Sequence, residues 1–151
     1  MTRHELTRQS KYSARAMFDM VADVASYEQF LPLVQQSTVF DIEGEVDSIL
    51  KFKGRLQVAR QNLNISETFI SDVVANHNDL TIVSTSNSGP VKHLSNIWKF
   101  VDLPNGGSQS RLVLDYEIAS FPMRMLMKAS SGIVMDKLTE AFEKRAKQLY
   151  G

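Results

Sequence analysis

Apolar and polar residues alternate with a period of two over most of residues 34–118. Leu50 and Phe52 alternate with Lys51 and Lys53, and the same rhythm recurs in later stretches, including Leu112, Leu114, Tyr116 and Ile118. Turn sequences break the alternation, at residues 43–45, 54, 75–78, 89–90 and 104–107. The pattern predicts a meander of about six antiparallel strands, each with one apolar face and one mostly polar face.

Helical spacing appears on both sides of this region. Residues 3–10 alternate loosely and predict a first strand, after which Ser13 can cap a helix that starts at Ala14. Ser26 is expected to cap a short turn over residues 27–31, which Pro32 ends. Ser120 can cap a long last helix whose apolar stripe contains Leu126, Met127, Ser130, Ile133, Val134, Leu138, Ala141, Phe142 and Leu149.

This order of elements predicts one α+β domain over residues 1–151. About seven strands would form a curved sheet around the long C-terminal helix. The order is typical of the helix-grip fold, also called START-like or Bet v 1-like. In that fold the sheet and the helix do not meet flush, and an apolar cavity lies between them.

Composition narrows the classes of function. Lys plus Arg and Asp plus Glu both number 17, so no overall charge favours nucleic acid, and DNA is not an expected partner. Cysteine is absent, which excludes disulfides and thiolate chemistry and fits a cytoplasmic protein. Neither a signal peptide nor a membrane-spanning stretch is recognisable, so contact with an inner membrane is expected only from the water side.

Four segments together carry a resemblance to a known family. They are residues 21–24 followed by Tyr27, Phe30, Leu31 and Pro32; residues 52–54; residues 89–94 followed by Trp98 and Phe100; and residues 141–146. In this order they resemble the coenzyme Q-binding and RatA-type family of the START-like, polyketide cyclase superfamily. Glu28 stands where members often have proline, and Leu33 where many have tryptophan.

The resemblance implies a protein that binds ubiquinone or a related polyprenyl lipid and supports respiration or quinone biosynthesis. The residues expected to line the site are Phe30, Leu31, Phe52, Leu94, Trp98, Phe100, Leu114, Tyr116, Met127, Ile133 and Val134. Trp98 could equally fill the core. Met123, Met125, Met127 and Met135 lie near the start of the last helix, where flexible thioethers suit an adaptable wall.

Catalysis and metal binding have little support in the sequence. The three histidines are far apart, and none belongs to a known catalytic motif or metal-ligand motif. His93 is expected on the outer face, near Asp115 or Glu117, and aromatase or cyclase chemistry would require it to face the cavity instead. Asp19 and Asp23 are one helical turn apart, and a solvated face explains them best. No catalytic residue, metal or required cofactor is therefore predicted.

The resemblance also implies a second function. Some bacterial members are ribosome association toxins, which bind ribosomal subunits and block their association. Lys51, Lys53 and Arg55 alternate along one strand face and form a candidate stripe for ribosomal RNA. An ordinary solvated strand face explains the same residues, so both interpretations remain open at this point.

Overall fold

Seven strands form one antiparallel sheet in the computed structural model, which describes residues 2–151 apart from the side chains of residues 63 and 129–132. The strands are β1 (Thr2–Ser10), β2 (Val34–Gly44), β3 (Ile49–Arg60), β4 (Ile65–Asn76), β5 (Thr81–Ser86), β6 (Val91–Asp102) and β7 (Ser108–Ile118). Their order in the sheet is β1-β7-β6-β5-β4-β3-β2. The predicted α+β class and the strand-rich central region are confirmed.

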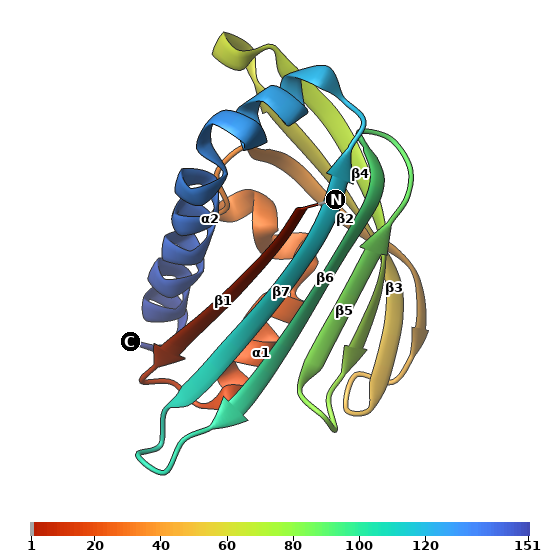
Figure 1. Ribbon diagram of the computed structural model, residues 1–151. Helices are drawn as coiled ribbons and strands as arrows, with labels where there is room; N and C mark the ends of the chain where they lie inside the picture. The colour runs from red at the N-terminus through yellow and green to blue at the C-terminus, as the bar shows by residue number, and fades with distance from the viewer. Residues whose placement is uncertain (1) are drawn as a thin grey trace.

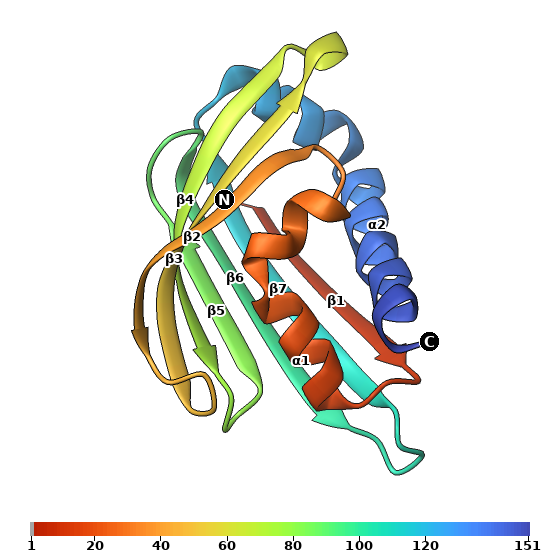
Figure 2. The ribbon, with the colours of Figure 1, turned by 180° about the vertical axis from the view of Figure 1, so that it is seen from behind.

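The sheet joins the beginning of the chain to its end. Strands β2 to β7 pair with their neighbours in sequence, as a meander requires, whereas β1 pairs with β7 from Thr2 opposite Tyr116 to Ser10 opposite Ser108. The sheet curves strongly, and its concave side holds the helices (Figures 1 and 2). A break in register between Phe40 and Glu43 interrupts the β2–β3 pairing, and such irregularities increase local twist.

A short helix, α1 (Ala14–Ala22), begins where the sequence predicts. The Ser13 hydroxyl accepts a hydrogen bond of 3.1 Å from the Ala16 amide, which is the expected cap. The next turn, the 3-10 helix η1 (Val24–Gln29), starts before Ser26. The prediction of a Ser26 cap is therefore wrong, and its hydroxyl donates instead to the Asp23 carboxylate at 2.6 Å.

The C-terminal helix α2 (Phe121–Tyr150) runs along the open side of the sheet (Figure 1). Ser120 occupies the predicted N-cap position, but its side chain makes no capping hydrogen bond, and its hydroxyl donates to the Glu67 carboxylate on β4. At the other end the Tyr150 hydroxyl donates to the Ala16 carbonyl of α1 at 2.8 Å. The predicted stripe position Ser130 lies outside the described side chains.

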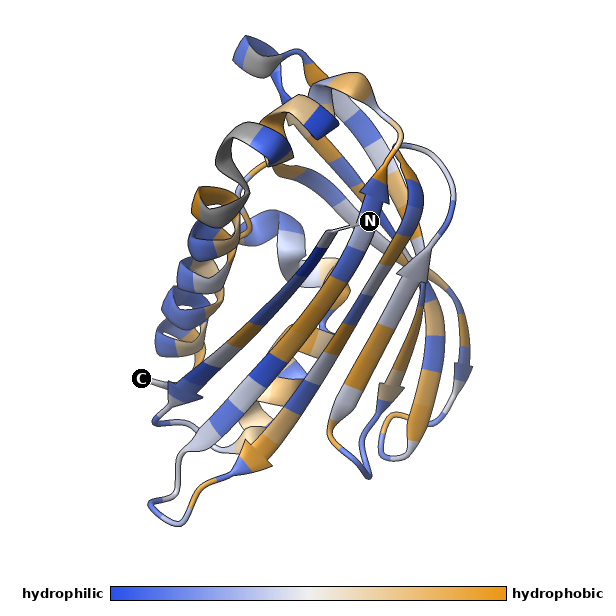
Figure 3. Ribbon diagram, in the orientation of Figure 1, coloured by the Kyte–Doolittle hydropathy of each residue, from blue (hydrophilic) through white to orange (hydrophobic). Residues whose placement is uncertain are grey.

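The core lies where α1 packs against the middle of the sheet. Figure 3 shows apolar and polar residues alternating along the strands. Phe18 packs edge-on against Phe100, with ring centroids 6.2 Å apart. Gly54 allows η1 to approach β3, since a Cβ atom there would lie 3.3 Å from Val24 Cγ1. Because α1 covers only part of the concave face, the rest of that face is left for the site. A further 3-10 turn, η2 (Gln61–Leu63), joins β3 to β4.

Candidate ligand-binding cavity

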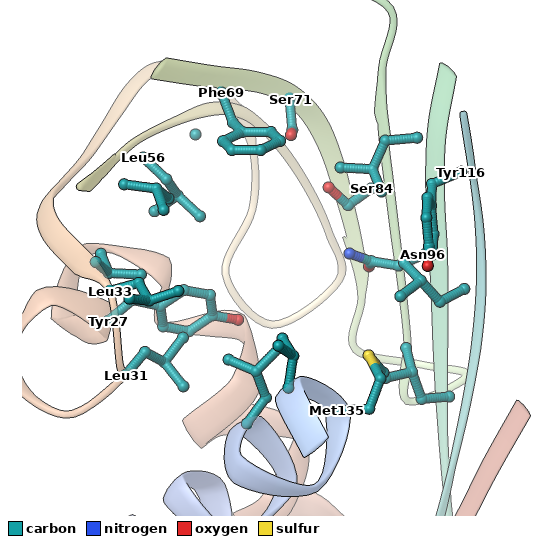
Figure 4. A pocket seen from close by; sticks show the side chains of 18 of the residues that line it. Tyr27, Leu31, Leu33, Leu56, Phe69, Ser71, Ser84, Asn96, Tyr116 and Met135 are labelled. Carbon is teal, nitrogen blue, oxygen red and sulfur yellow. The ribbon is translucent and has the colours of Figure 1, made fainter. Parts of the chain in front are cut away.

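A cavity of about 300 Å³ lies between the sheet, η1 and α2. Figure 4 shows it from close by, with side chains converging from the sheet and from the helices. Successive side chains of a strand point to opposite faces of the sheet, so the even-numbered residues of β6 and β7 form much of the floor. This part of the lining consists of Leu94, Asn96, Trp98, Leu112, Leu114, Tyr116 and Ile118.

The opposite wall comes from α2 and from the segment after η1. Met123, Met127 and Met135 are three of the α2 residues on this wall, and Leu31 and Leu33 follow η1. Thioether side chains are unbranched and polarisable, so they can adapt to ligands of irregular shape. The helix wall is therefore softer than the strand wall opposite.

A cluster of aromatic rings closes the cavity toward the C-terminal end of α2. Phe142 lies at its centre, with centroid distances of 5.6 Å to Tyr27, 5.4 Å to Phe30 and 5.6 Å to Trp98. A second cavity of about 30 Å³ lies beyond Trp98 and Phe142, which line both spaces. Together with Leu112 and Thr139, which also line both, these two rings separate the two cavities.

Seven of the eleven residues named from the sequence lie on the cavity wall. They are Leu31, Leu94, Trp98, Leu114, Tyr116, Met127 and Val134. They come from the segment after η1 and from β6, β7 and α2, so segments far apart in the sequence converge as the helix-grip order requires. Trp98 contributes to the wall and also stacks on Phe100, so it lies at the boundary between cavity and core.

The other four residues lie elsewhere. Phe52 and Phe100 are on the expected face of the sheet, but α1 covers it there, and Phe100 is only 2% exposed within the core. Phe30 packs on the outer side of Phe142, with the Arg145 guanidinium 5.2 Å from its ring centroid. Ile133 is 61% exposed, because adjacent helical residues are about 100° apart and Val134 is the one that faces the cavity.

Several polar residues of the lining were not expected from the sequence. Ser71, Ser84 and Asn96 face the cavity from β4, β5 and β6, and Figure 4 shows Ser71 beside Phe69, with Ser84 and Asn96 nearer to Tyr116. Asn96 occupies the same alternating row as Leu94 and Trp98, so the period of two was a signal for its orientation. The methionines Met123 and Met135 are also buried in the wall, whereas Met125 faces out.

Two tyrosines bring hydroxyl groups to the cavity. Burial raises the pKa of Tyr27 well above its usual range, Asp23 adds to this effect, and the hydroxyl donates to the Val21 carbonyl. Burial also raises the pKa of Tyr116, whose hydroxyl lies 3.3 Å from His4 Nε2. Both phenols are therefore neutral at ordinary pH and contribute hydrogen-bonding capacity without charge.

Charged side chains do not occur among the described residues that line the cavity. His93 lies opposite Glu117 in the β6–β7 register and is not part of the wall. The condition that the sequence set for cyclase chemistry, a histidine facing the cavity beside a carboxylate, is therefore not met by His93. Within residues 2–151 the structure also shows no cluster of His, Asp or Glu side chains that could hold a metal ion.

The predicted basic stripe lies on the outer face of β3, away from the cavity. Lys53 forms an ion pair of 3.2 Å with Asp72 on β4, and Lys51 lies opposite Glu43 on β2. Arg55 is opposite Thr38 and Ile70, and its side chain is exposed. Acidic neighbours thus offset two of the three positive charges.

A curved antiparallel sheet that closes with a C-terminal helix over an apolar cavity defines a START-like, Bet v 1-like helix-grip domain. Comparison with known proteins agrees. The chain belongs to the family described as polyketide cyclase / dehydrase and lipid transport, whose sequence profile matches residues 10–143. The resemblance recognised in the sequence is thereby confirmed.

Relatives with different names are similar to the chain over most of its length. The chain is 32% identical over 144 residues to the ribosome association toxin RatA of Pseudomonas aeruginosa, covering 93% of this chain and 92% of the relative. It is 29% identical over 150 residues to the mitochondrial coenzyme Q-binding protein COQ10 of Dictyostelium discoideum, covering 97% of this chain and 70% of the relative.

Two solved structures share the fold across nearly their whole length. An 18 kDa protein from Caulobacter crescentus gives a TM-score of 0.79 at 24% identity, covering 100% of this chain and 99% of the other. The ZhuI aromatase/cyclase from Streptomyces sp. R1128 gives a TM-score of 0.77 at 18% identity, covering 97% of this chain and 94% of the other. At these identities the likeness describes the fold alone.

No helix within the described residues has both the length and the apolar character needed to span a bilayer.

Proposed function

We propose that this protein binds ubiquinone or a related polyprenyl lipid in the cavity, without catalysis, and so supports respiratory electron transport or quinone biosynthesis. The observation that carries the proposal is the lining of the cavity, which is apolar except for a few neutral polar groups. Such a lining stabilises apolar surface removed from water, at about 25 cal/mol per Å². The likeness to a coenzyme Q-binding protein supports the same ligand class.

The size of the cavity limits how much of the ligand is enclosed. A dry cavity of about 150 Å³ holds one benzene molecule. The volume of about 300 Å³ therefore accommodates a quinone ring and a comparable amount of chain, about one or two isoprene units. A longer polyprenyl tail leaves the cavity and must be covered by another apolar surface.

The outer side of α2 offers such a surface at a membrane. Phe121, Met125 and Ile133 are exposed there, and the Arg124 guanidinium lies 5.9 Å from the Phe121 ring centroid. Lys128 adds a second cation, and residues 121–135 contain no acidic residue. Exposed apolar side chains flanked by cations favour anionic lipid surfaces. The proposed localisation is therefore cytoplasmic with peripheral contact at the inner membrane.

Titration with decylubiquinone, a ubiquinone with a short saturated tail, tests the proposal. Trp98 is the sole tryptophan and lines the cavity, so bound quinone should quench its fluorescence saturably. Leu114→Phe adds volume inside the cavity and should weaken binding about tenfold. Ile97→Phe on the outer face is the matched control, because Ile97 is 42% exposed. Absence of saturable quenching, with no lipid recovered by solvent extraction, would contradict the proposal.

Binding to ribosomal subunits is a second candidate function, favoured by the RatA relatives. The surface proposed for it is the stripe of Lys51, Lys53 and Arg55. Sucrose-gradient profiles of ribosomes with added protein measure the effect directly, and charge reversal at Arg55, which lacks a facing acid, should weaken it. Unchanged subunit association at low salt would exclude this function.

A further inference from the structure

The cavity contains a pair of polar side chains that apolar binding alone does not explain. Ser84 on β5 and Asn96 on β6 are directly opposite each other in the antiparallel register, and both line the cavity. Directly opposed residues have Cβ atoms about 5 Å apart. Figure 4 shows the two side chains next to each other on the sheet wall.

Ser84 and Asn96 are half-buried, and neither side chain has a hydrogen-bond partner within the part of the chain that the structure describes, whereas two fully buried serines do. Ser86, two residues along β5, donates to the Ile70 carbonyl at 2.6 Å. Ser37 on β2 donates to the Ala25 carbonyl at 2.7 Å. The fold thus satisfies serine hydroxyls where they serve packing, whereas the Ser84 and Asn96 groups remain available to a molecule in the cavity.

The row beside the pair toward α1 is apolar. It consists of Ile82 and Trp98, which are themselves cross-strand partners. A hydrocarbon ligand that displaced water from the pair would leave its polar groups unpaired at a cost in free energy, so a lining selected only for hydrocarbon would favour leucine or valine at these positions. The pair is therefore best explained by a ligand group that it hydrogen-bonds.

Resting on the proposed function, we infer that Ser84 and Asn96 recognise a carbonyl-bearing head of the ligand. The Asn96 amide supplies two N–H donors and the Ser84 hydroxyl one O–H donor, which suits a quinone carbonyl oxygen. The ring then lies against β5 and β6, and the chain extends toward the methionines of α2. The specificity is for a carbonyl-bearing ring with an apolar tail, as opposed to a bare hydrocarbon.

Two ligands of the same tail separate head recognition from apolar burial. Decylubiquinone carries the carbonyls, and decylbenzene has a ring and the same tail without them. Affinity for the first is measured by Trp98 quenching, and affinity for the second by its competition with decylubiquinone. Asn96→Leu and Ser84→Ala each remove one polar group, and Ser95→Ala, on the outer face of β6, is the matched control.

We expect either variant to weaken decylubiquinone binding about tenfold and to leave decylbenzene binding unchanged or tighter. Ser95→Ala should change neither. Thermal unfolding is measured for each variant, and a melting temperature equal to or above that of the wild-type protein shows that the fold is intact.

Two results would overturn the inference while leaving the proposed function in place: wild-type protein that binds both ligands equally, or variants that lose both equally. Wild-type protein that binds neither ligand would instead contradict the proposed function itself.

Discussion

Phe142 is the residue whose removal should most disturb the closure of the cavity. Its ring contacts those of Tyr27, Phe30 and Trp98, and thereby joins α2 to η1 and to β6. Truncation of a buried phenylalanine to alanine costs about 3–5 kcal/mol, and each aromatic pair contributes about 0.5–1.5 kcal/mol beyond burial. Because Phe142 is only partly buried, we expect Phe142→Ala to lower the free energy of unfolding by about 3 kcal/mol.

Urea unfolding followed by Trp98 fluorescence and circular dichroism measures this loss. For a domain of this size it corresponds to a melting temperature lower by about 6–12 °C. Phe142→Leu should lose less, about 1–1.5 kcal/mol, since it keeps most of the volume. Phe121→Ala is the control on the same helix, because Phe121 is 64% exposed. If Phe142→Ala costs no more than Phe121→Ala, the aromatic cluster does not secure α2.

Further predictions concern the ligand, the membrane, the helix cap and the response to pH. Affinity for ubiquinones should rise with the first one or two isoprene units and then level off, because the cavity encloses only about that much chain. An affinity that keeps rising up to long tails in the Trp98 quenching assay would contradict this. Reversing Arg124 and Lys128 to glutamate should reduce cosedimentation with anionic vesicles and leave decylubiquinone affinity unchanged, whereas equal sedimentation of both proteins would exclude this surface. Ser13→Ala should lower the free energy of unfolding by about 1 kcal/mol in urea titrations, and no loss would mean that the cap is dispensable. The raised pKa of Tyr27 keeps its phenol neutral in the folded state, so its contribution to stability is complete below the unfolded pKa of about 10 and declines as pH rises above it. Tyr27→Phe should flatten that alkaline decline in the free energy of unfolding. Identical profiles of unfolding free energy against pH for the two proteins would refute the assignment.

The architecture was predictable because each element carries its own periodicity. The strands alternate, and Ser13 precedes a helical pattern that the structure confirms. The two cap predictions that differ from the structure have separate causes. The turn that Ser26 was expected to cap begins earlier, at Val24, and the Ser120 side chain bonds to the Glu67 carboxylate on another strand. The Glu67 contact joins residues 53 positions apart, which local sequence cannot reveal.

The cavity itself was only partly predictable. Trp98 and Phe100 share one face of β6, and the sequence cannot tell that α1 crosses the sheet over one ring and leaves the other at the cavity. Ile133 fits the apolar stripe by spacing, yet a rotation of one helical position places Val134 inside. Asn96 was missed for a different reason, since one polar residue in an apolar row reads as an irregularity until its neighbour across the strands is known to be Ser84.

The pairing of β1 with β7 and the position of α2 have a consequence for how the protein folds. The first strand pairs with residues 108–118, and the helix that covers the cavity, Phe121–Tyr150, follows all seven strands in the chain. Until α2 packs over the sheet, the apolar part of the concave face that it covers is open to water. Such long-range closure slows folding and leaves apolar surface exposed to aggregation or to chaperones. Ligand binding therefore requires α2 to be packed over the sheet, and truncation within α2 should abolish it at the folding stage.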